Sequence, residues 1–227
     1  MKKVLTLLLS LLAAVGTYGQ EDPEYRMEIG AGAGLVTYLG DFNGNLLRNM
    51  QPMGSLVAKY RMNPRMAWAL EVGYGKLKGS SADEKTWYPE LSEQPVSFSH
   101  GLIDVGLRYE YNFWAFGTGR EYRGARPLTP FITLGLGLAY ADAKPDHSLA
   151  SSLQLGGGLK YKVADRLNLT AEWVIHFTGS DLLDGVADPY GIKSSGLFKN
   201  TDGYSTLRIA VTYDIWAKCK TCNNDRD

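Results

Sequence analysis

Apolar and polar residues alternate along most of this chain, and the segment 203–216 shows the pattern most clearly. One set of alternate positions in it is entirely apolar, namely Leu207, Ile209, Val211, Tyr213 and Ile215. The other set contains Arg208 and Asp214. Successive side chains of a β-strand point to opposite faces, so the pattern predicts a strand with one apolar and one charged face. Such a strand suits a closed barrel in lipid, with the apolar face outside.

The same period of two recurs in eight segments, at 25–38, 54–62, 66–76, 96–113, 129–142, 149–163, 166–178 and 203–216. Tight turns are expected at Asn63-Pro64-Arg65 and at Ala164-Asp165, whereas 39–53, 77–95 and 179–202 form longer connections. Short periplasmic turns that alternate with longer outer loops are typical of outer-membrane barrels. We therefore predict an all-β fold over residues 20–216, an eight-stranded antiparallel transmembrane up-and-down β-barrel in the outer membrane of a Gram-negative bacterium. The basic segment 114–128 is a long connection on the periplasmic side.

Most charged residues of these segments fall in the set of positions opposite to the apolar set. An eight-stranded barrel is only wide enough inside for side chains, and buried charges need partners. We therefore predict a paired network in the lumen, formed by Arg26, Glu28, Lys59, Arg61, Glu71, Asp104, Arg108, Glu110, Lys160, Glu172 and Arg208, with Lys162 and Asp214 of the same parity.

Aromatic residues gather at both ends of the predicted strands, as expected at the two faces of a bilayer. One band comprises Tyr60, Tyr109, Tyr111, Tyr161 and Tyr213, and the other comprises Tyr74, Tyr140 and Phe177. A soluble lipocalin-type barrel, the alternative, would place the apolar set inside and has no reason to carry such bands.

The amino terminus has the pattern of a secretory signal peptide. Lys2 and Lys3 precede an apolar run from Val4 to Val15, which at about twelve residues is short for a spanning helix. Small residues at Thr17 and Gly19 predict cleavage after residue 19. The chain has 24 basic and 24 acidic residues, a balance that gives no indication of nucleic-acid binding.

Three groups of residues could carry chemistry or bind a metal. Cys219 and Cys222 lie in the tail 217–227, beyond the last strand and hence in the periplasm, where an internal disulfide, a bond to a partner and a pair without a role are all open. Glu172, His176 and Ser180 resemble a hydrolase constellation, but the serine lies past the strand end and the histidine points inward. The segment 41–45 resembles part of a calcium loop without its downstream glutamate. We expect no catalytic residue, no cofactor and no metal site.

Several longer motifs resemble one family, the PorG-type outer-membrane barrels of Bacteroidota. They are YLGDFN at 38–43, YRMNPR at 60–65, GLRYEYNF at 106–113, GTGREYRG at 117–124, KYKVADRLN at 160–168, SDLLDGV at 180–186 and AKCKTC at 217–222. The resemblance implies a non-enzymatic component of the type IX protein secretion system that anchors the periplasmic ring built by PorK and PorN.

Topology suggests which residues would meet such a ring. The periplasmic elements are the segment 114–128, with Arg120, Arg123 and Arg126, and the tail that carries Cys219 and Cys222. The alternative is a lipid A-modifying or adhesion barrel that acts through the outer loops 39–53, 77–95 and 179–202.

The signal-peptide assignment predicts the first residue of the mature protein. Protein purified from outer membranes should begin at Gln20, because the small residues at 17 and 19 suit the cleavage site. Amino-terminal sequencing checks this, and a mature chain that still begins at Met1 would contradict it.

Overall fold

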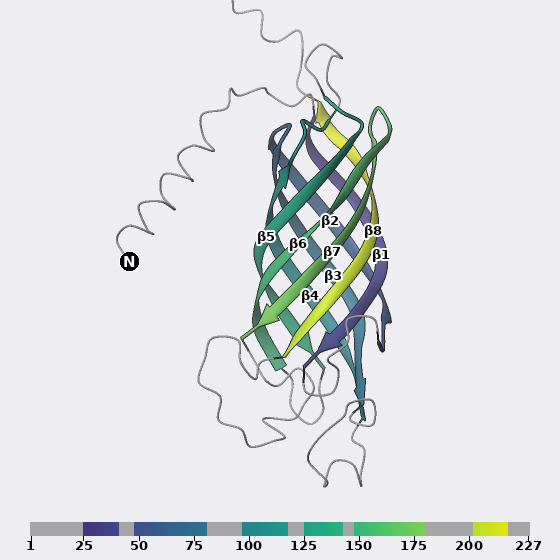
Figure 1. Cartoon of the computed structure of the whole chain (residues 1–227), viewed down its shortest axis with the longest axis vertical. Helices are drawn as coiled ribbons and strands as arrows, with labels where there is room; N and C mark the ends of the chain where they lie inside the picture. Colours follow the sequence, from purple (N-terminus) through teal and green to yellow (C-terminus); the bar gives the residue numbers. More distant parts are fainter. Residues whose placement is uncertain are drawn as a thin grey trace, which may run out of the picture.

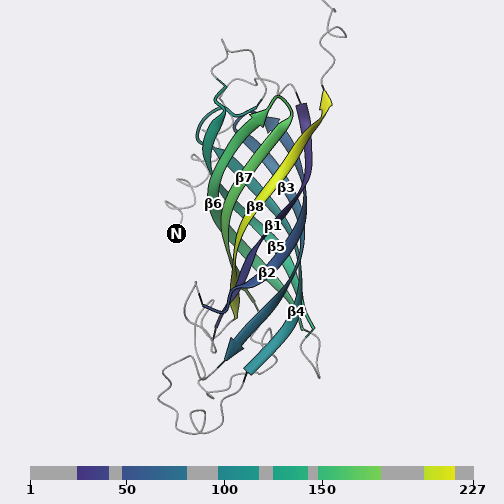
Figure 2. The ribbon, with the colours of Figure 1, turned by 90° about the vertical axis from the view of Figure 1, so that its right-hand side faces the viewer.

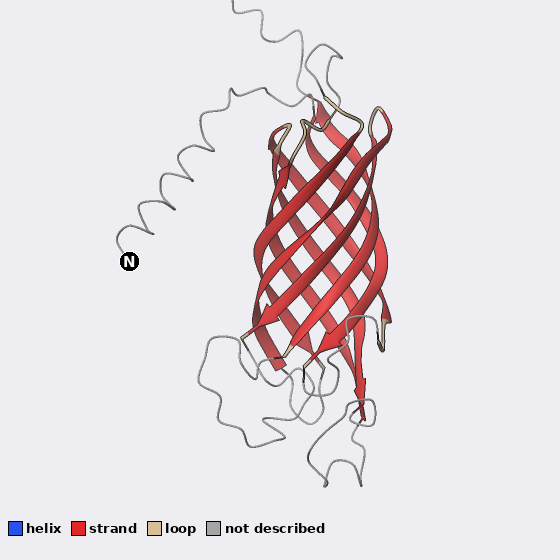
Figure 3. Ribbon diagram, viewed as in Figure 1, coloured by secondary structure: helices blue, strands red, loops and turns tan. Residues whose placement is uncertain are grey.

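The computed structural model describes residues 25–40, 48–80, 97–117, 125–142, 148–179 and 202–217. These residues form eight strands: β1 (Tyr25–Leu39), β2 (Gln51–Asn63), β3 (Met66–Ser80), β4 (Ser97–Asn112), β5 (Leu128–Ala141), β6 (Ser148–Ala164), β7 (Leu167–Thr178) and β8 (Gly203–Ala217). Each strand pairs antiparallel with its neighbour in the chain, and β8 pairs with β1, which closes the barrel (Figure 1; Figure 3). The predicted fold class is confirmed.

The two ends of the barrel differ in how the chain connects its strands. Pro64–Arg65 and Asp165–Arg166 form tight turns at one end, as predicted, and residues 113–117 and 125–127 lie at the same end. We call this the turn end and the opposite end the loop end. The predicted signal peptide and most residues of the four loop-end connections lie outside the described residues.

The largest difference between a predicted and an observed strand boundary is at the loop end of β3. The strand was expected to end at residue 76, yet it continues to Ser80 and pairs with β4 as far as Ser97. Lys76 and Lys78 interrupt the apolar parity, but Leu77 between them is fully buried inside the barrel. Polar residues at outward positions therefore mark the limit of the apolar outer wall rather than the end of the strand.

The pairing register fixes the sense in which the strands tilt. A path across the sheet at right angles to the strands, from Tyr74 near the loop end, passes Gly54, Ala33, Ile209, Ala171, Leu159 and Pro130. Pro130 lies at the turn end, where its carbonyl accepts a hydrogen bond from Phe113 N at 3.0 Å. The path thus descends from one end to the other, and the tilted strands are visible in Figure 2.

The outer wall of the barrel is apolar and the inner face is polar over most of its length. On β5, Ile132, Leu134, Leu136 and Leu138 are each more than half exposed, whereas Thr133 between them is buried. In the described part of the chain, no helix has the length and apolar character needed to cross a bilayer. The aromatic bands lie on this outer wall, with Tyr60 and Tyr213 near the turn end and Tyr74 near the loop end.

The loop end of the interior holds an apolar cluster that the parity of the sequence did not predict. It comprises Val36, Tyr38, Met53, Leu77, Phe98, Leu102, Ala139, Ala141, Ala150 and Tyr204. The Tyr38 and Phe98 rings meet edge to face with centroids 4.9 Å apart. A network of paired charges was predicted for the lumen; at the loop end, side chains from opposite walls instead fill the lumen with apolar contacts.

Because the apolar wall faces lipid, the cost of adding a charge to it should depend on how deep in the bilayer the charge lies. Leu136→Arg, near mid-wall, should lower the free energy of unfolding in lipid vesicles by about 2–4 kcal/mol, because the guanidinium would enter hydrocarbon. Leu128→Arg, at the turn end of the same strand, should cost about 0–1 kcal/mol. Denaturant titration of both variants checks this, and equal costs at the two positions would contradict it.

Candidate functional site

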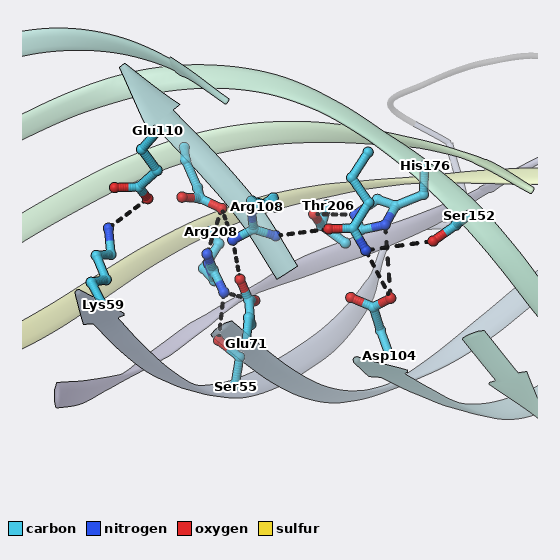
Figure 4. Close-up of polar contacts among 12 residues, drawn as sticks. Ser55, Lys59, Glu71, Asp104, Arg108, Glu110, Ser152, His176, Thr206 and Arg208 are labelled. Carbon is cyan, nitrogen blue, oxygen red and sulfur yellow. Dashed lines mark hydrogen bonds and ion pairs between the residues drawn. The ribbon is translucent and has the colours of Figure 1, made fainter. Parts of the chain in front are cut away.

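Four charged residues from four strands meet in the middle of the lumen. Arg108 of β4 contacts Glu71 of β3 and Glu172 of β7, the latter at 3.0 Å, and Arg208 of β8 contacts both carboxylates (Figure 4). Arg208 also donates to Ser55 Oγ at 3.0 Å. The two cations and two anions neutralise one another and link opposite walls of the barrel.

The small residues of the inner face make room for these long side chains. Gly135 on β5 faces Arg108, and a Cβ atom there would lie 2.6 Å from Arg108 Cγ. A larger residue would therefore displace the arginine from its partners. Gly135 and Gly32, where a Cβ atom would lie 3.2 Å from Arg208 Cδ, thus make room for the central ion pairs.

A second group of charges lies nearer the turn end. Glu110 accepts from Lys59 at 2.8 Å and from Lys160 at 2.5 Å, one lysine on each carboxylate oxygen. The Phe131 ring lies beneath both ammonium groups, 5.8 Å from Lys59 and 4.7 Å from Lys160. The aromatic face partly compensates the second cation that a single carboxylate leaves unbalanced.

A third group lies at the turn end itself. Arg61 Nε donates to Glu28 at 2.6 Å, and Arg61 Nη2 donates to Asp214 at 2.9 Å. The other oxygen of Asp214 accepts from Lys162 at 2.9 Å, and Thr212 donates to Glu28 at 2.8 Å. These bonds connect β2, β1, β8 and β6 around the mouth of the barrel.

On the loop side of the central charges lies a polar layer around Asp104. Tyr204 OH donates to Asp104 at 2.6 Å, and His176 Nδ1 lies 3.8 Å from the same oxygen. His176 Nε2 is 3.2 Å from Thr206 Oγ1, and the His176 and Tyr204 rings stack with centroids 4.1 Å apart. This layer connects the ion pairs to the apolar cluster at the loop end.

The structure places ten of the eleven residues proposed for the lumen network in these layers; Arg26 is half-buried near the turn end. With Lys162 and Asp214, the layers hold six basic residues, Lys59, Arg61, Arg108, Lys160, Lys162 and Arg208, and six acidic ones, Glu28, Glu71, Asp104, Glu110, Glu172 and Asp214. Sequence reasoning missed the uncharged members Gln154, Tyr204 and Phe131, although inward parity was a signal for all three. The arrangement binds the strands together and fills the lumen.

The turn-end mouth is covered by residues 113–117 and 125–127, a feature that we call the turn-end cap. Phe116 enters the mouth and is 2% exposed, and its ring lies 5.7 Å from the Arg61 guanidinium and 5.8 Å from Lys162 Nζ. Phe116 N donates to Pro64 O at 2.9 Å, and Arg126 N donates to Ala115 O at 2.8 Å. The sequence predicted a long basic connection here but not that it folds into the barrel.

The outer side of the turn-end cap carries exposed aromatic and basic side chains. The Arg126 guanidinium lies 4.9 Å from the Trp114 ring, and Arg65 donates to Phe113 O at 3.2 Å. Trp114 and Phe113 are 40% and 46% exposed. The other proposed partner-binding residues, Arg120, Arg123, Cys219 and Cys222, lie outside the described residues.

The hydrolase-like constellation does not assemble among the described residues. Glu172 is engaged by Arg108 and Arg208, while His176 contacts Thr206 and Asp104 deep in the lumen. Ser180 lies outside the described residues. In the described ranges, no group of three or more His, Cys, Asp or Glu residues is arranged to hold a metal ion.

A closed barrel with an apolar outer wall and a charge-paired lumen defines a membrane-spanning β-barrel protein. The chain belongs to the outer membrane protein beta-barrel domain family, which matches residues 5–214. No curated protein matches the chain.

The chain is similar to several solved outer-membrane barrels, at low sequence identity. Neisserial surface protein A is 17% identical with a TM-score of 0.50, and the match covers 83% of this chain and 97% of that one. The barrel domain of Pseudomonas aeruginosa OprF is 14% identical (TM-score 0.43; 83% and 97% covered), and the outer membrane enzyme PagL is 13% identical (TM-score 0.42; 83% and 99% covered). The likeness to Neisserial surface protein A concerns the fold alone.

The protein is therefore an outer-membrane barrel of a Gram-negative bacterium. Outer-membrane barrels have short turns on the periplasmic side and longer loops outside the cell. The turn end, with its cap, accordingly faces the periplasm, and the loop end faces the exterior.

The central ion pairs predict a specific pattern of destabilisation. Arg208→Met leaves Arg108 facing two carboxylates and should cost about 3–5 kcal/mol of unfolding free energy, since it leaves a buried charge uncompensated. Adding Glu172→Gln to this variant removes the excess anion and should recover a large part of the loss. Denaturant titration in vesicles measures both; a double variant no more stable than Arg208→Met would show that charge balance is not what matters.

Proposed function

We propose that this protein is a non-enzymatic barrel of the PorG type that anchors the periplasmic ring of a type IX secretion system. The motif resemblance along the chain supports this assignment, and ring subunits of the PorK and PorN type are the proposed partners. The barrel supplies a fixed position in the outer membrane, and its periplasmic face binds the ring.

The observation that carries the proposal is the turn-end cap. Hydrogen bonds to Pro64 and Pro130 hold it against the mouth, and Phe116 is inserted beneath it. A surface held in place in this way loses little conformational entropy on binding a partner. The cap is thus suited to be a docking platform rather than a free loop.

The side chains on the cap favour a protein partner with acidic and apolar groups. Trp114 and Arg126 stack on each other at the exposed surface, and both residue types are enriched among those that dominate binding energy at protein interfaces. Arg65 and the exposed Arg166 lie at the same end, and Arg120 and Arg123 lie in the sequence between the two parts of the cap. Basic residues at the rim would accelerate association with an acidic partner.

The contacts within the lumen support the non-enzymatic part of the proposal. Glu172 serves the central ion pairs, and His176 is buried between Tyr204, Thr206 and Asp104, away from the lipid on the outer wall. A lipid-modifying enzyme would need its histidine and serine within reach of that lipid.

Replacing the exposed cap residues tests the proposal. Trp114→Ala with Arg126→Ala should reduce co-purification of PorK- and PorN-type proteins from cross-linked membranes at least about tenfold, the effect of losing one strong interface residue. Deleting 218–227, which includes both cysteines, tests the tail separately.

Arg48→Ala, an exposed arginine near the loop end, is the matched control and should leave co-purification unchanged. Heat-modifiable electrophoretic mobility verifies that each variant still forms a barrel. Full recovery of the ring proteins with both the cap variant and the tail deletion would reject the docking role.

A further inference from the structure

Two lysines project from the outer wall of β3 at the loop end. Lys76 and Lys78 are exposed and of outward parity, while Leu77 between them points into the apolar cluster. Alternate residues of a strand lie about 7 Å apart on the same face, so the two ammonium groups form a pair. Within the described part of the chain, neither has a hydrogen-bond or ion-pair partner.

The depth of the pair corresponds to the headgroups of the outer leaflet. Lys76 follows Tyr74, which belongs to the loop-end aromatic band and is 61% exposed. Rings of this kind lie at headgroup level, and Lys78 lies farther out along the same strand. Asp142, across Gly101 from Lys76, has contacts of its own.

An apolar hollow of about 590 Å³ lies in the outer wall over β1, β2 and β3. Its lining includes the small residues Ala31 and Ala58 and the larger residues Leu56, Leu70 and Val72. The hollow faces hydrocarbon and is open to the surrounding lipid.

The tilt of the strands places this hollow below the lysine pair. With a tilt of about 35–45°, a line from Lys76 toward the periplasm leaves β3, crosses β2 near Gly54 and reaches β1 near Ala31. A Cβ atom added at Gly54 would have no other atom within 4 Å. The outer surface between the lysines and the hollow is therefore also free of protruding side chains at this position. Cationic groups and an apolar channel are therefore aligned along the membrane normal.

We propose that Lys76, Lys78 and this hollow form a binding site for the lipid A part of lipopolysaccharide. The ammonium groups bind a phosphate of the lipid A headgroup, and an acyl chain lies over Gly54 and Ala31. Lipid A fits because it is the phosphate-bearing lipid of the outer leaflet, and a charge-assisted lysine–phosphate contact is strong where water is scarce. The site is independent of the periplasmic cap.

Binding of lipid A to the full-length mature barrel in detergent tests the proposal. Lipid A with two phosphates, the same lipid after dephosphorylation and phosphatidylglycerol serve as probes, and native mass spectrometry measures their occupancy. Lys76→Gln with Lys78→Gln should weaken binding of phosphorylated lipid A at least about tenfold, since it removes the charge-assisted contacts. It should leave binding of the dephosphorylated lipid unchanged. Ala31→Phe, which fills the hollow, should weaken both forms of lipid A.

Two matched variants separate the site from general effects on the barrel. Arg65→Gln with Arg166→Gln removes two exposed charges at the turn end, and Ala171→Phe adds a ring to the outer wall of β7; neither should alter lipid A binding. The proposal is overturned if the lysine variant binds phosphorylated lipid A as tightly as the unaltered protein. It is also overturned if phosphatidylglycerol binds equally well and depends equally on the lysines.

Discussion

The structure depends on the pairing of charges inside a wall that faces hydrocarbon. Outside, the bilayer offers no water to solvate an ionised group, so every charge in the spanning region must lie within the lumen. Inside, each charge needs a partner, which the ion pairs among the layers and, at Asp104, a hydrogen bond from Tyr204 provide. Arg108 and Arg208 join walls that the backbone hydrogen bonds connect only through neighbouring strands. The side-chain network thus adds cross-links to a closed ladder of backbone bonds.

Much of this fold could be predicted because successive side chains of a strand point to opposite faces, and one face meets lipid while the other meets the polar lumen. The alternation at Leu207, Arg208 and Ile209 assigns each side chain to lipid or lumen without further information. The same rule failed at Lys76, where the outward face leaves the hydrocarbon but β3 continues. Beyond the apolar band, alternate residues of β3 still point into the barrel. Leu77 is one of them, and it belongs to the apolar cluster at the loop end.

The partners within the lumen could not be read from the sequence. Parity shows that Glu172 points inward, but its contacts with Arg108 and Arg208 depend on the register of four strands. The insertion of Phe116 depends likewise on hydrogen bonds between the cap and the turn at Pro64, which leave no periodic signal. The alternation of apolar and polar residues within one strand shows which face a residue lies on. Its contacts across the barrel depend on how the eight strands pair when the barrel closes.

The two ends of the barrel present different surfaces for the two proposed interactions. The cap, with Trp114 and Arg126, offers a held platform to a periplasmic protein, and Lys76 and Lys78 offer cations to the outer leaflet. Both proposals presuppose that the apolar set of residues faces lipid. Probe accessibility at two adjacent β5 positions tests this most directly, with Leu134→Cys and Thr133→Cys each labelled in a chain whose native cysteines are replaced. A fluorophore at 134 should be quenched by nitroxides placed on lipid acyl chains, whereas one at 133 should not; the reverse order, or equal quenching, would contradict the account.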